Sequence, residues 1–308
     1  MRRIVLGAGP VGLIAAYLLR ASCVGEVVGG ARKLRSLSPT YLWATPGVDA
    51  LIHSLGFAVK RCRVRFGWLT PAGIMDVPTP EDRARYVARS RGVSLGKASY
   101  ASSGRRGNLL TYDLSVEDLV AALRERVTVH RGTVERVVVG TGEIAVLMFE
   151  GRIYLRDSVV NTLPAPVWNG LLQRRIRTPL EAGCKTFVSS EVAWDLRLVE
   201  ESMLGLARRR YLYVSDPEVP FDRVMLRDGH TYVYEFNKSM IPASFLREVD
   251  GRIEYSHCGQ VTGDVLPEGE FGGRVVHLGR MARWDHSIRL HDVVDRVLAM
   301  REEVPRVD

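Results

Sequence analysis

A glycine-rich motif near the start of the chain constrains its fold more than any other feature. Residues 7–12 read Gly-Ala-Gly-Pro-Val-Gly, directly after the apolar run Ile-Val-Leu and at the start of a helix expected over about residues 10–20. In such a strand–turn–helix unit the first glycine permits the turn. The second lets a pyrophosphate approach the backbone, and the third lets the helix pack against the strand. The free N–H groups of the helix start favour anionic phosphates. The motif therefore predicts a Rossmann-type dinucleotide site formed by Gly7, Gly9, Pro10, Val11 and Gly12.

A carboxylate follows this motif at the distance expected of a ribose ligand. Glu26 lies nineteen positions after Gly7, and in dinucleotide sites an acid about twenty residues on binds a ribose hydroxyl. The alternative for this N-terminus is a secretory signal, because the chain starts Met-Arg-Arg and then turns apolar. Three glycines, Pro10 and Arg20 fit a signal core poorly, so we assign Glu26 to the ribose.

The composition indicates a large globular chain of the cytoplasm. Its 308 residues and 46% hydrophobic content are enough to bury a large core. The four cysteines are scattered without a Cys-x-x-Cys pair, which disfavours a disulfide framework or a zinc ribbon and favours a reducing compartment. No stretch of about eighteen uninterrupted apolar residues occurs, so we expect no membrane-spanning segment.

The charge balance raises the question of an anionic partner. The formal net charge is +8, and arginine supplies 38 of the 43 basic residues. Clusters such as residues 208–210 would suit phosphate, a nucleotide or nucleic acid. Because 35 acidic residues are interspersed, we favour solvated, salt-bridged faces, and nucleic acid is the less favoured partner. Abundant ionic and scarce amide side chains suggest a heat-adapted, thermophile source, although an arginine bias also follows genome base composition.

The order of predicted elements separates two kinds of architecture. Patterns of α/β type occupy both ends of the chain, whereas residues 185–255 have β patterning. A nicotinamide dehydrogenase would continue βαβαβ without this interruption, so the interruption favours a flavin over NAD. We therefore expect an α/β fold with a Rossmann-type FAD-binding domain, discontinuous in sequence, and an inserted β-rich substrate domain. The first would comprise residues 1–60, 105–170 and 270–308, and the second residues 61–104 and 171–269.

Four stretches carry a family resemblance, and they occur in the family's order. They are residues 7–12 with Glu26 and the pair Gly29-Gly30, then residues 130–137, 157–166 and 277–284. Together they resemble the FAD-dependent superfamily of amine oxidases, protoporphyrinogen oxidases and UDP-galactopyranose mutases. The resemblance implies tightly bound FAD and, because the chain is short for the family, a minimal substrate domain.

The resemblance also implies further cofactor ligands. The pair Gly29-Gly30 would hold the flavin phosphates and the ribityl chain, and the backbone of Val134 would lie against the adenine. The other ligands belong to two loops. The first would lie near the adenosine half, and the second near the pyrophosphate and the isoalloxazine ring. They are Thr162 in the first loop, and Gly279, Arg280 and Ile288 in the second and the stretch after it.

Catalytic candidates follow the glycine–arginine turn. Trp284 and His286 would face the flavin, where His286 could move a proton near neutral pH; the alternative is a packed tryptophan and a helix cap. His286 and His291 lie five positions apart and therefore off one helical face, so we expect no metal site. Lys185 and Lys238 are the candidates for the lysine that, in the family, binds a water beside the flavin.

A second candidate site lies on predicted strands of the central segment. Arg223, together with Tyr232, Tyr234 and Glu235, would form a polar, aromatic pocket for an anionic substrate if these residues face the flavin. Ordinary alternation of side chains in a β-sheet is the alternative.

Three functions from different classes follow from these observations. The first is an oxidoreductase in which flavin N5 accepts a hydride from a C–N or C–C bond of a small anionic or amine-bearing substrate. The second is a redox-neutral flavin mutase that acts on a nucleotide sugar. The third is a flavoprotein, or a binding module, that acts on nucleic acid. The sequence leaves the substrate, the electron acceptor and the oligomeric state open.

Overall fold

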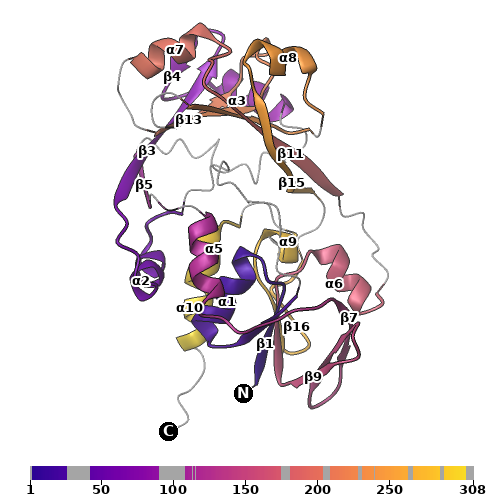
Figure 1. The fold of residues 1–308 in the computed structure, drawn as a ribbon. Coiled ribbons are helices and arrows are strands. Elements are labelled where there is room, and N and C mark those ends of the chain that lie inside the picture. Colours follow the sequence, from indigo (N-terminus) through magenta and orange to yellow (C-terminus); the bar gives the residue numbers. More distant parts are fainter. Residues whose placement is uncertain are drawn as a thin grey trace.

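The protein consists of two larger β-sheets with their helices, which lie one above the other in Figure 1, and a small β-meander. The structure is a computed structural model and describes residues 2–25, 42–89, 108–112, 114, 116–174, 181–203, 209–227, 231–238, 240–262, 266–284 and 288–302. The expected ligands Glu26, Gly29 and Gly30, and the candidate His286, lie outside these residues.

The first sheet has the strand order of a Rossmann fold. Its six strands run β16-β17-β10-β1-β2-β6, and all neighbours except β16 and β17 are parallel. The chain builds β2 and β6 on one side of β1 and then continues with β10 on the other side. Folds of this kind bind ligands at that switch point, beyond the carboxyl ends of the strands. The strands are β1 (Arg3–Leu6), β2 (Ser22–Val24), β6 (Val129–His130), β10 (Ser158–Asn161), β16 (Gly269–Glu270) and β17 (Val275–His277).

The central strand β1 is covered on both faces. Ile4, Val5 and Leu6 are fully buried, as expected of an apolar run in a parallel sheet. Val5 packs into a cluster formed mainly by helices, whereas Ile4 and Leu6 pack into a cluster with a β-meander.

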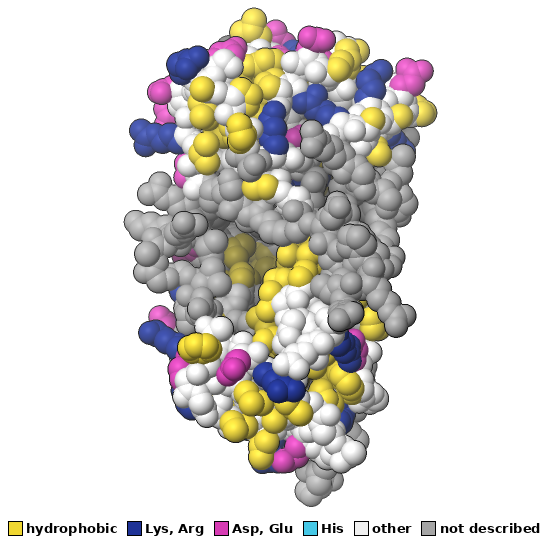
Figure 2. Space-filling model, turned by 90° about the vertical axis from the view of Figure 1, so that its right-hand side faces the viewer, with side chains coloured by type: hydrophobic (Ala, Val, Ile, Leu, Met, Phe, Trp, Pro, Cys, Tyr) yellow, Lys and Arg dark blue, Asp and Glu magenta, His cyan; other side chains and the backbone are white. Residues whose placement is uncertain are grey.

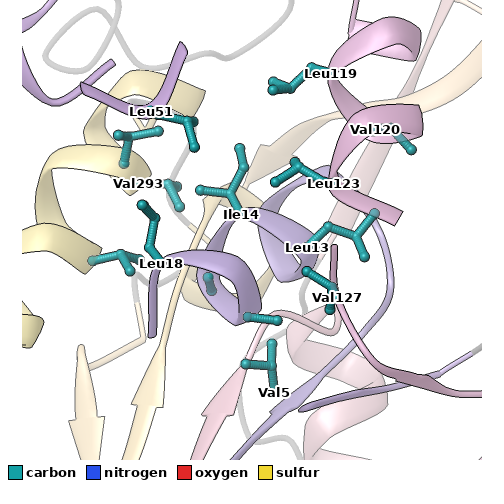
Figure 3. Close-up of a cluster of buried hydrophobic side chains, with 14 of the residues drawn as sticks. Val5, Leu13, Ile14, Leu18, Leu51, Leu119, Val120, Leu123, Val127 and Val293 are labelled. Carbon is teal, nitrogen blue, oxygen red and sulfur yellow. The ribbon is translucent and has the colours of Figure 1, made fainter. Parts of the chain in front are cut away.

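Figure 3 shows the cluster on the helical face. Leu13 and Leu18 of the helix after the glycine motif meet Leu51, Leu123 and Val293, which come from distant parts of the chain. The start and the end of the sequence therefore share one core. The helices that supply it are α1 (Pro10–Leu19), α2 (Pro46–Ser54), α5 (Val116–Arg124) and α10 (Leu290–Glu302).

The opposite face packs against a three-stranded meander and a short helix. Val137 and Met148 of the meander and Trp168 of the helix are buried with Ile4 and Leu6. The strands of the meander are β7 (Val134–Val139), β8 (Ile144–Met148) and β9 (Ile153–Arg156), and the helix is α6 (Ala165–Leu171).

The second sheet is mostly antiparallel. Its order is β15-β11-β14-β13-β12-β3-β4, with β5 also paired to β3, and the pair of β3 and β12 is parallel. The strands are β3 (Arg61–Thr70), β4 (Gly73–Met75), β5 (Asn108–Tyr112), β11 (Glu181–Ser190), β12 (Arg209–Val214), β13 (Arg223–Arg227), β14 (Thr231–Phe236) and β15 (Arg252–Thr262).

The two faces of the second sheet differ in chemistry. One face is apolar and packs with Leu198 of α7 (Leu196–Met203) and Phe245 of α8 (Ala243–Glu248). The other face carries the charged residues of the cluster described below, and Tyr86 of α3 (Pro80–Arg89) contacts it. Alternation along the strands separates these two sets of side chains.

The expected α/β class, with a parallel sheet and a β-rich insert, is confirmed. The strand at residues 108–112 joins the second sheet, and that at residues 269–270 joins the first. Which residues form a cofactor domain and which a substrate domain stays a prediction. On the face shown in Figure 2, basic and acidic side chains are interspersed in both halves of the molecule. Within the described ranges, no helix combines the length and the apolar character needed to cross a membrane.

Candidate functional site

The glycine motif forms a tight turn at the switch point of the first sheet. Gly7 has φ +101°, a left-handed conformation that favours glycine. A Cβ atom on Gly7 would lie 2.5 Å from Thr162 Oγ1, and a Cβ atom on Gly12 would lie 1.7 Å from the Gly7 carbonyl oxygen. Both positions therefore require glycine, as the motif predicts.

Gly9 differs from the other two glycines of the motif. A Cβ atom on Gly9 would meet no atom within 4 Å. Gly9 is the N-cap of α1, where no side chain caps the helix and no acidic residue occupies the first turn. An uncapped helix start beside an open backbone is the arrangement that binds a phosphate group. These residues therefore fit the pyrophosphate of a dinucleotide.

Thr162 and Cys23 fix the turn from the neighbouring strands. The Thr162 hydroxyl donates to the Leu6 carbonyl oxygen at 2.7 Å and lies 3.3 Å from that of Gly7. The Cys23 thiol donates to the same Gly7 oxygen at 3.2 Å, and burial raises the pKa of this thiol to about 12. Both side chains therefore position the backbone of the turn, and the thiol is held in its neutral form.

A second turn, after β17, meets the first. Gly279 has φ +87°, and a Cβ atom there would lie 3.1 Å from Val11 Cγ1. Arg280 follows as the first residue of α9 (Arg280–Arg283), which lies at the end of the lower half that faces the second sheet in Figure 1. The positive charge of Arg280 contributes to lowering the pKa of Lys185 on β11. Arg280 therefore acts electrostatically on the charged face of the second sheet.

That face carries a buried cluster of charges around Glu235. The ammonium of Lys185 donates to Glu235 Oε1, and Arg223 Nη1 lies 3.3 Å from the same oxygen. Tyr211 donates to Glu235 Oε2 at 3.3 Å and accepts from Arg223 Nη1 at 3.0 Å. One carboxylate thus faces two cations of its own sheet.

Aromatic rings enclose the Arg223 guanidinium. Its Cζ atom lies 5.8 Å from the ring centroid of Tyr86, 6.0 Å from that of Tyr211 and 5.4 Å from that of Tyr213. Arg223 Nε also donates to the Tyr86 hydroxyl at 2.6 Å. Cation–π and hydrogen-bond contacts together fix the guanidinium in place.

Burial changes the acid–base properties of this cluster. The pKa of Lys185 is lowered to about 8, first by burial and then by the charges of Arg223 and Arg280, while Glu235 opposes the shift. Burial raises the pKa of Tyr211 well above its usual value. Lys185 is therefore a group that can exchange a proton near neutral pH.

Asn237 adds an unpaired amide beside the cluster. It lies two residues after Glu235, directly beyond the end of β14, and its backbone N–H donates to Asp222 Oδ2 at 2.7 Å. Both polar atoms of its side chain are buried, and neither has a hydrogen-bond partner. Such a group has unused capacity to donate and to accept.

The structure brings together part of the predicted site. Gly7, Gly9, Pro10, Val11 and Gly12 lie in one turn, with Thr162 and the Gly279–Arg280 turn against it. Val134 begins the meander strand β7, and Ile288 packs against the helical core. Their roles as ligands stay predictions.

The polar pocket predicted around Arg223 needs correction. Glu235 does lie beside Arg223, but Tyr232 and Tyr234 pack into the apolar cluster on the opposite face of the sheet. They lie three residues and one residue before Glu235 on the same strand. Because side chains alternate between the two faces of a sheet, both point to the face opposite that of Glu235. The tyrosines that enclose Arg223 are Tyr86, Tyr211 and Tyr213, which come from α3 and from β12.

Trp284 is a packed residue in this structure. It is 3% exposed and lies in an apolar cluster with Ala165 and Val261. This is the alternative considered for it from the sequence. It therefore packs together with Ala165 of α6 and Val261 of β15.

The comparisons with known proteins agree with this architecture. No protein-family model matches the sequence, and no curated protein matches it. Solved structures do match its fold. A candidate protoporphyrinogen oxidase from Exiguobacterium matches with a TM-score of 0.60 at 13% identity, with 98% of each chain covered.

Two further structures share the fold. A putrescine oxidase bound to putrescine matches with a TM-score of 0.60 at 11% identity, covering 98% of each chain. A candidate FAD-containing monooxygenase from Photorhabdus luminescens matches with a TM-score of 0.55 at 11% identity, covering 98% of this chain and 88% of the other. At these identities the likeness shows that the chain shares the fold of these proteins, and it shows the fold alone.

Proposed function

We propose that the chain is an FAD-dependent oxidoreductase in which a small substrate would give a hydride to a bound flavin. The observation that carries the proposal is the meeting of the Gly7–Gly12 turn, Thr162 and the Gly279–Arg280 turn at one switch point. The fold shared with oxidase and monooxygenase structures supports the same function.

The first sheet would hold the cofactor. Bound FAD would supply N5, the atom that accepts the hydride. The open backbone at Gly9 and the first N–H groups of α1 would receive the pyrophosphate, and the Arg280 guanidinium would pair with the same phosphates. Glu26 would bind the ribose, and Gly29 with Gly30 would hold the flavin phosphates and ribityl chain.

The second sheet would bind the substrate. Lys185 and Arg223 bring two positive charges to one carboxylate, Glu235, while the nearby carboxylate of Asp222 is paired with Arg89. Because buried charges need compensation, an anionic group on the substrate, such as a carboxylate, would complete the balance. The unpaired amide of Asn237 would add one donor and one acceptor for such a group.

Lys185 would also exchange a proton with the substrate or with a bound water. Of the two candidate lysines, Lys238 is exposed and lies over the ring of Phe236, whereas Lys185 is buried on the charged face. A lysine whose pKa is lowered to about 8 can bind a water or accept a proton from an amine substrate near neutral pH. Lys185 is therefore the better match to the flavin-side lysine of the family.

Chromophore release tests the cofactor. The denatured protein should release a yellow compound that co-migrates with FAD, and release of NAD(P) or of FMN alone would contradict the proposal. Small amino acids, other carboxylates and amines should then be screened anaerobically for bleaching of the bound flavin. A substrate that bleaches it should also consume O₂ or reduce an artificial acceptor in steady state.

Asn237→Ala tests the substrate side. Removing an amide that has no partner should leave the free energy of unfolding within about 1 kcal/mol of wild type. The KM of the substrate found in the screen should rise about tenfold, since a hydrogen bond to a charged group is worth roughly 1.5–3 kcal/mol. An unchanged KM would show that Asn237 does not contact the substrate.

A redox-neutral mutase that acts on a nucleotide sugar is the second candidate. The two cations at Glu235 favour it, because a nucleoside diphosphate would supply the negative charge that balances the excess positive charge of Lys185 and Arg223. Turnover that requires pre-reduced flavin and consumes no O₂ would identify the mutase and exclude the oxidase.

A further inference from the structure

Asn161 and His277 lie at the carboxyl ends of two neighbouring strands, directly before the two turns assigned to the cofactor. Asn161 ends β10 and precedes Thr162, and His277 ends β17, two residues before Gly279. Both side chains are fully buried, and Asn161 Nδ2 lies 3.0 Å from His277 Nδ1. This contact therefore joins the strand ends that carry both turns.

The direction of this hydrogen bond is set by the backbone. Leu163 N, which can only donate, lies 3.1 Å from Asn161 Oδ1. The amide oxygen of Asn161 therefore faces Leu163, and its NH₂ group faces His277. His277 Nδ1 must accept this bond, so the neutral imidazole carries its proton on Nε2.

His277 Nε2 is buried and has no hydrogen-bond partner, but a carboxylate lies near it. Nε2 lies 3.5 Å from Glu270 Oε2, on the edge strand β16. The same carboxylate accepts from Trp168 Nε1 at 3.2 Å and from Arg174 Nη1 at 2.9 Å. The pKa of Glu270 is lowered to about 2, first by His277 and then by Trp168 and Arg174. Among the described residues, Glu270 is the charged group facing His277, and Arg174 lies behind it.

If His277 bound a second proton, its Nδ1 would change from an acceptor to a donor in the contact with Asn161. Both ring nitrogens of an imidazolium donate, so Nδ1–H would oppose the NH₂ group of Asn161. Glu270 would stabilise the charged ring, and the amide of Asn161 would turn to present its oxygen to Nδ1. Leu163 N would then lose its acceptor.

Leu163 lies against the glycine motif, so this change reaches the cofactor turn. A Cβ atom on Gly7 would lie 3.3 Å from Leu163 Cδ2 and 3.6 Å from Leu163 N. We propose that Asn161 and His277 form a proton-controlled brace that aligns both cofactor turns, and that uptake of a proton by His277 weakens FAD binding. His277 is a positioning residue in this proposal. The expected effect on FAD binding rests on the proposed function.

The pH dependence of FAD binding tests the brace. FAD dissociation constants should be measured at a series of pH values from acid to neutral, and the protonation of the His277 ring should be followed by NMR at the same pH values. Loss of one ordinary hydrogen bond should raise the wild-type Kd about fivefold at the acid end. In His277→Asn, the side-chain oxygen can accept from Asn161 and cannot be protonated, so the Kd should be independent of pH. His53→Asn, which replaces an exposed histidine of α2, should keep the wild-type dependence.

Asn161→Asp separates the brace from a general loss of stability in acid. A carboxylate at this position can accept from Leu163 N and from protonated His277 together, so the variant should bind FAD at the acid end at least as tightly as at neutral pH. An acid-induced loss of FAD affinity as large as that of wild type in both variants would overturn the proposal.

Measurements on wild-type apoprotein keep the brace separate from the proposed function. Nitrogen NMR should show His277 with its proton on Nε2 at neutral pH, and the amide signal of Leu163 should titrate together with the His277 ring. A proton on Nδ1, or a Leu163 amide that does not respond, would overturn the brace even if FAD binds. If both NMR results hold and no FAD binds at any pH, the proposed function fails and the brace remains.

Discussion

Gly12 packs so closely against Gly7 that a Cβ atom on Gly12 would lie 1.7 Å from the Gly7 carbonyl oxygen. In the same motif a Cβ atom on Gly9 would meet no atom within 4 Å. The packing of the chain therefore excludes a side chain at Gly12 and leaves room for one at Gly9. At Gly12 the limit is the contact between helix and strand, whereas at Gly9 the limit is the space that a ligand would need.

Gly12→Ala and Gly9→Val should separate these roles. Gly12→Ala should lower the free energy of unfolding of the apoprotein by about 1–3 kcal/mol or more, because the clash is with backbone. Gly9→Val should change it by less than about 0.5 kcal/mol yet abolish FAD retention, because its branched side chain fills the pyrophosphate space. Urea denaturation and flavin content measure both effects. A folded Gly9→Val protein with full flavin content would refute the placement of the cofactor.

Glu235→Gln should be strongly destabilising. It leaves Lys185 and Arg223 buried without their carboxylate, and breaking a buried pair costs about 3–5 kcal/mol. The loss should be smaller at about pH 9 than at pH 7, because Lys185 is then mostly neutral. Tyr211→Phe is the matched control. It removes one hydroxyl from the same cluster and should cost roughly 0.5–1.5 kcal/mol per hydrogen bond. Equal losses in the two variants would contradict this account.

Lys185 should make stability rise with pH in the alkaline range. Its pKa is lowered from 10.5 to about 8 in the folded protein, so between these values the unfolded chain holds a proton that the folded chain has released. The unfolded state then binds more protons, and the free energy of unfolding increases with pH. Below about pH 8, Lys185 is protonated in both the folded and the unfolded state, and the free-energy cost of burying its charge is fully present.

The measurement is urea denaturation of the apoprotein between about pH 7 and pH 10, compared with Lys185→Met. The wild-type curve should rise relative to that of the variant above about pH 8. Parallel curves would show that Lys185 titrates at its ordinary value.

Arg280→Ala and Arg283→Ala should affect different properties. Arg283 pairs with Glu268 at 3.3 Å and is 24% exposed in its side chain, so its loss should cost stability, by about 0–1 kcal/mol. Arg280 precedes it at the start of α9 and is assigned to phosphate, a contact worth roughly 1.5–3 kcal/mol, which is at least a tenfold loss of FAD affinity. Calorimetric FAD titration and thermal denaturation separate the two effects. Wild-type FAD affinity in Arg280→Ala would contradict the role assigned to this turn.

Local parts of the fold and the site could be predicted from the sequence. The strand, turn and helix around Gly7 form over a dozen residues, and their packing is set by glycines adjacent in the chain. The cap of α2 is equally local, since Thr45 accepts from Val48 N at 3.2 Å within one turn. Such features depend on backbone sterics and on short-range hydrogen bonds.

Residues of the site that come from distant segments were less predictable. Tyr86 contacts Arg223 from α3, 137 positions away in the chain, and no spacing marks the two as neighbours. Tyr211 lies on β12, the strand directly before that of Arg223, so its pairing was as predictable as that of Glu235. The pairing of Arg223 with Glu235 was predictable, because the two strands are consecutive, but their partners depend on which face is buried. Alternation along β14 could have excluded Tyr232 and Tyr234.

The sequence by itself therefore determined the glycine turn and the adjacent helix, because these rest on short-range geometry. Only the tertiary structure decided that Asn161 meets His277, and that the charge of Arg280 acts on Lys185. Both relationships join residues about a hundred positions apart. Burial is what gives them their effect, since it removes the water that would otherwise satisfy the amide, the imidazole and the ammonium.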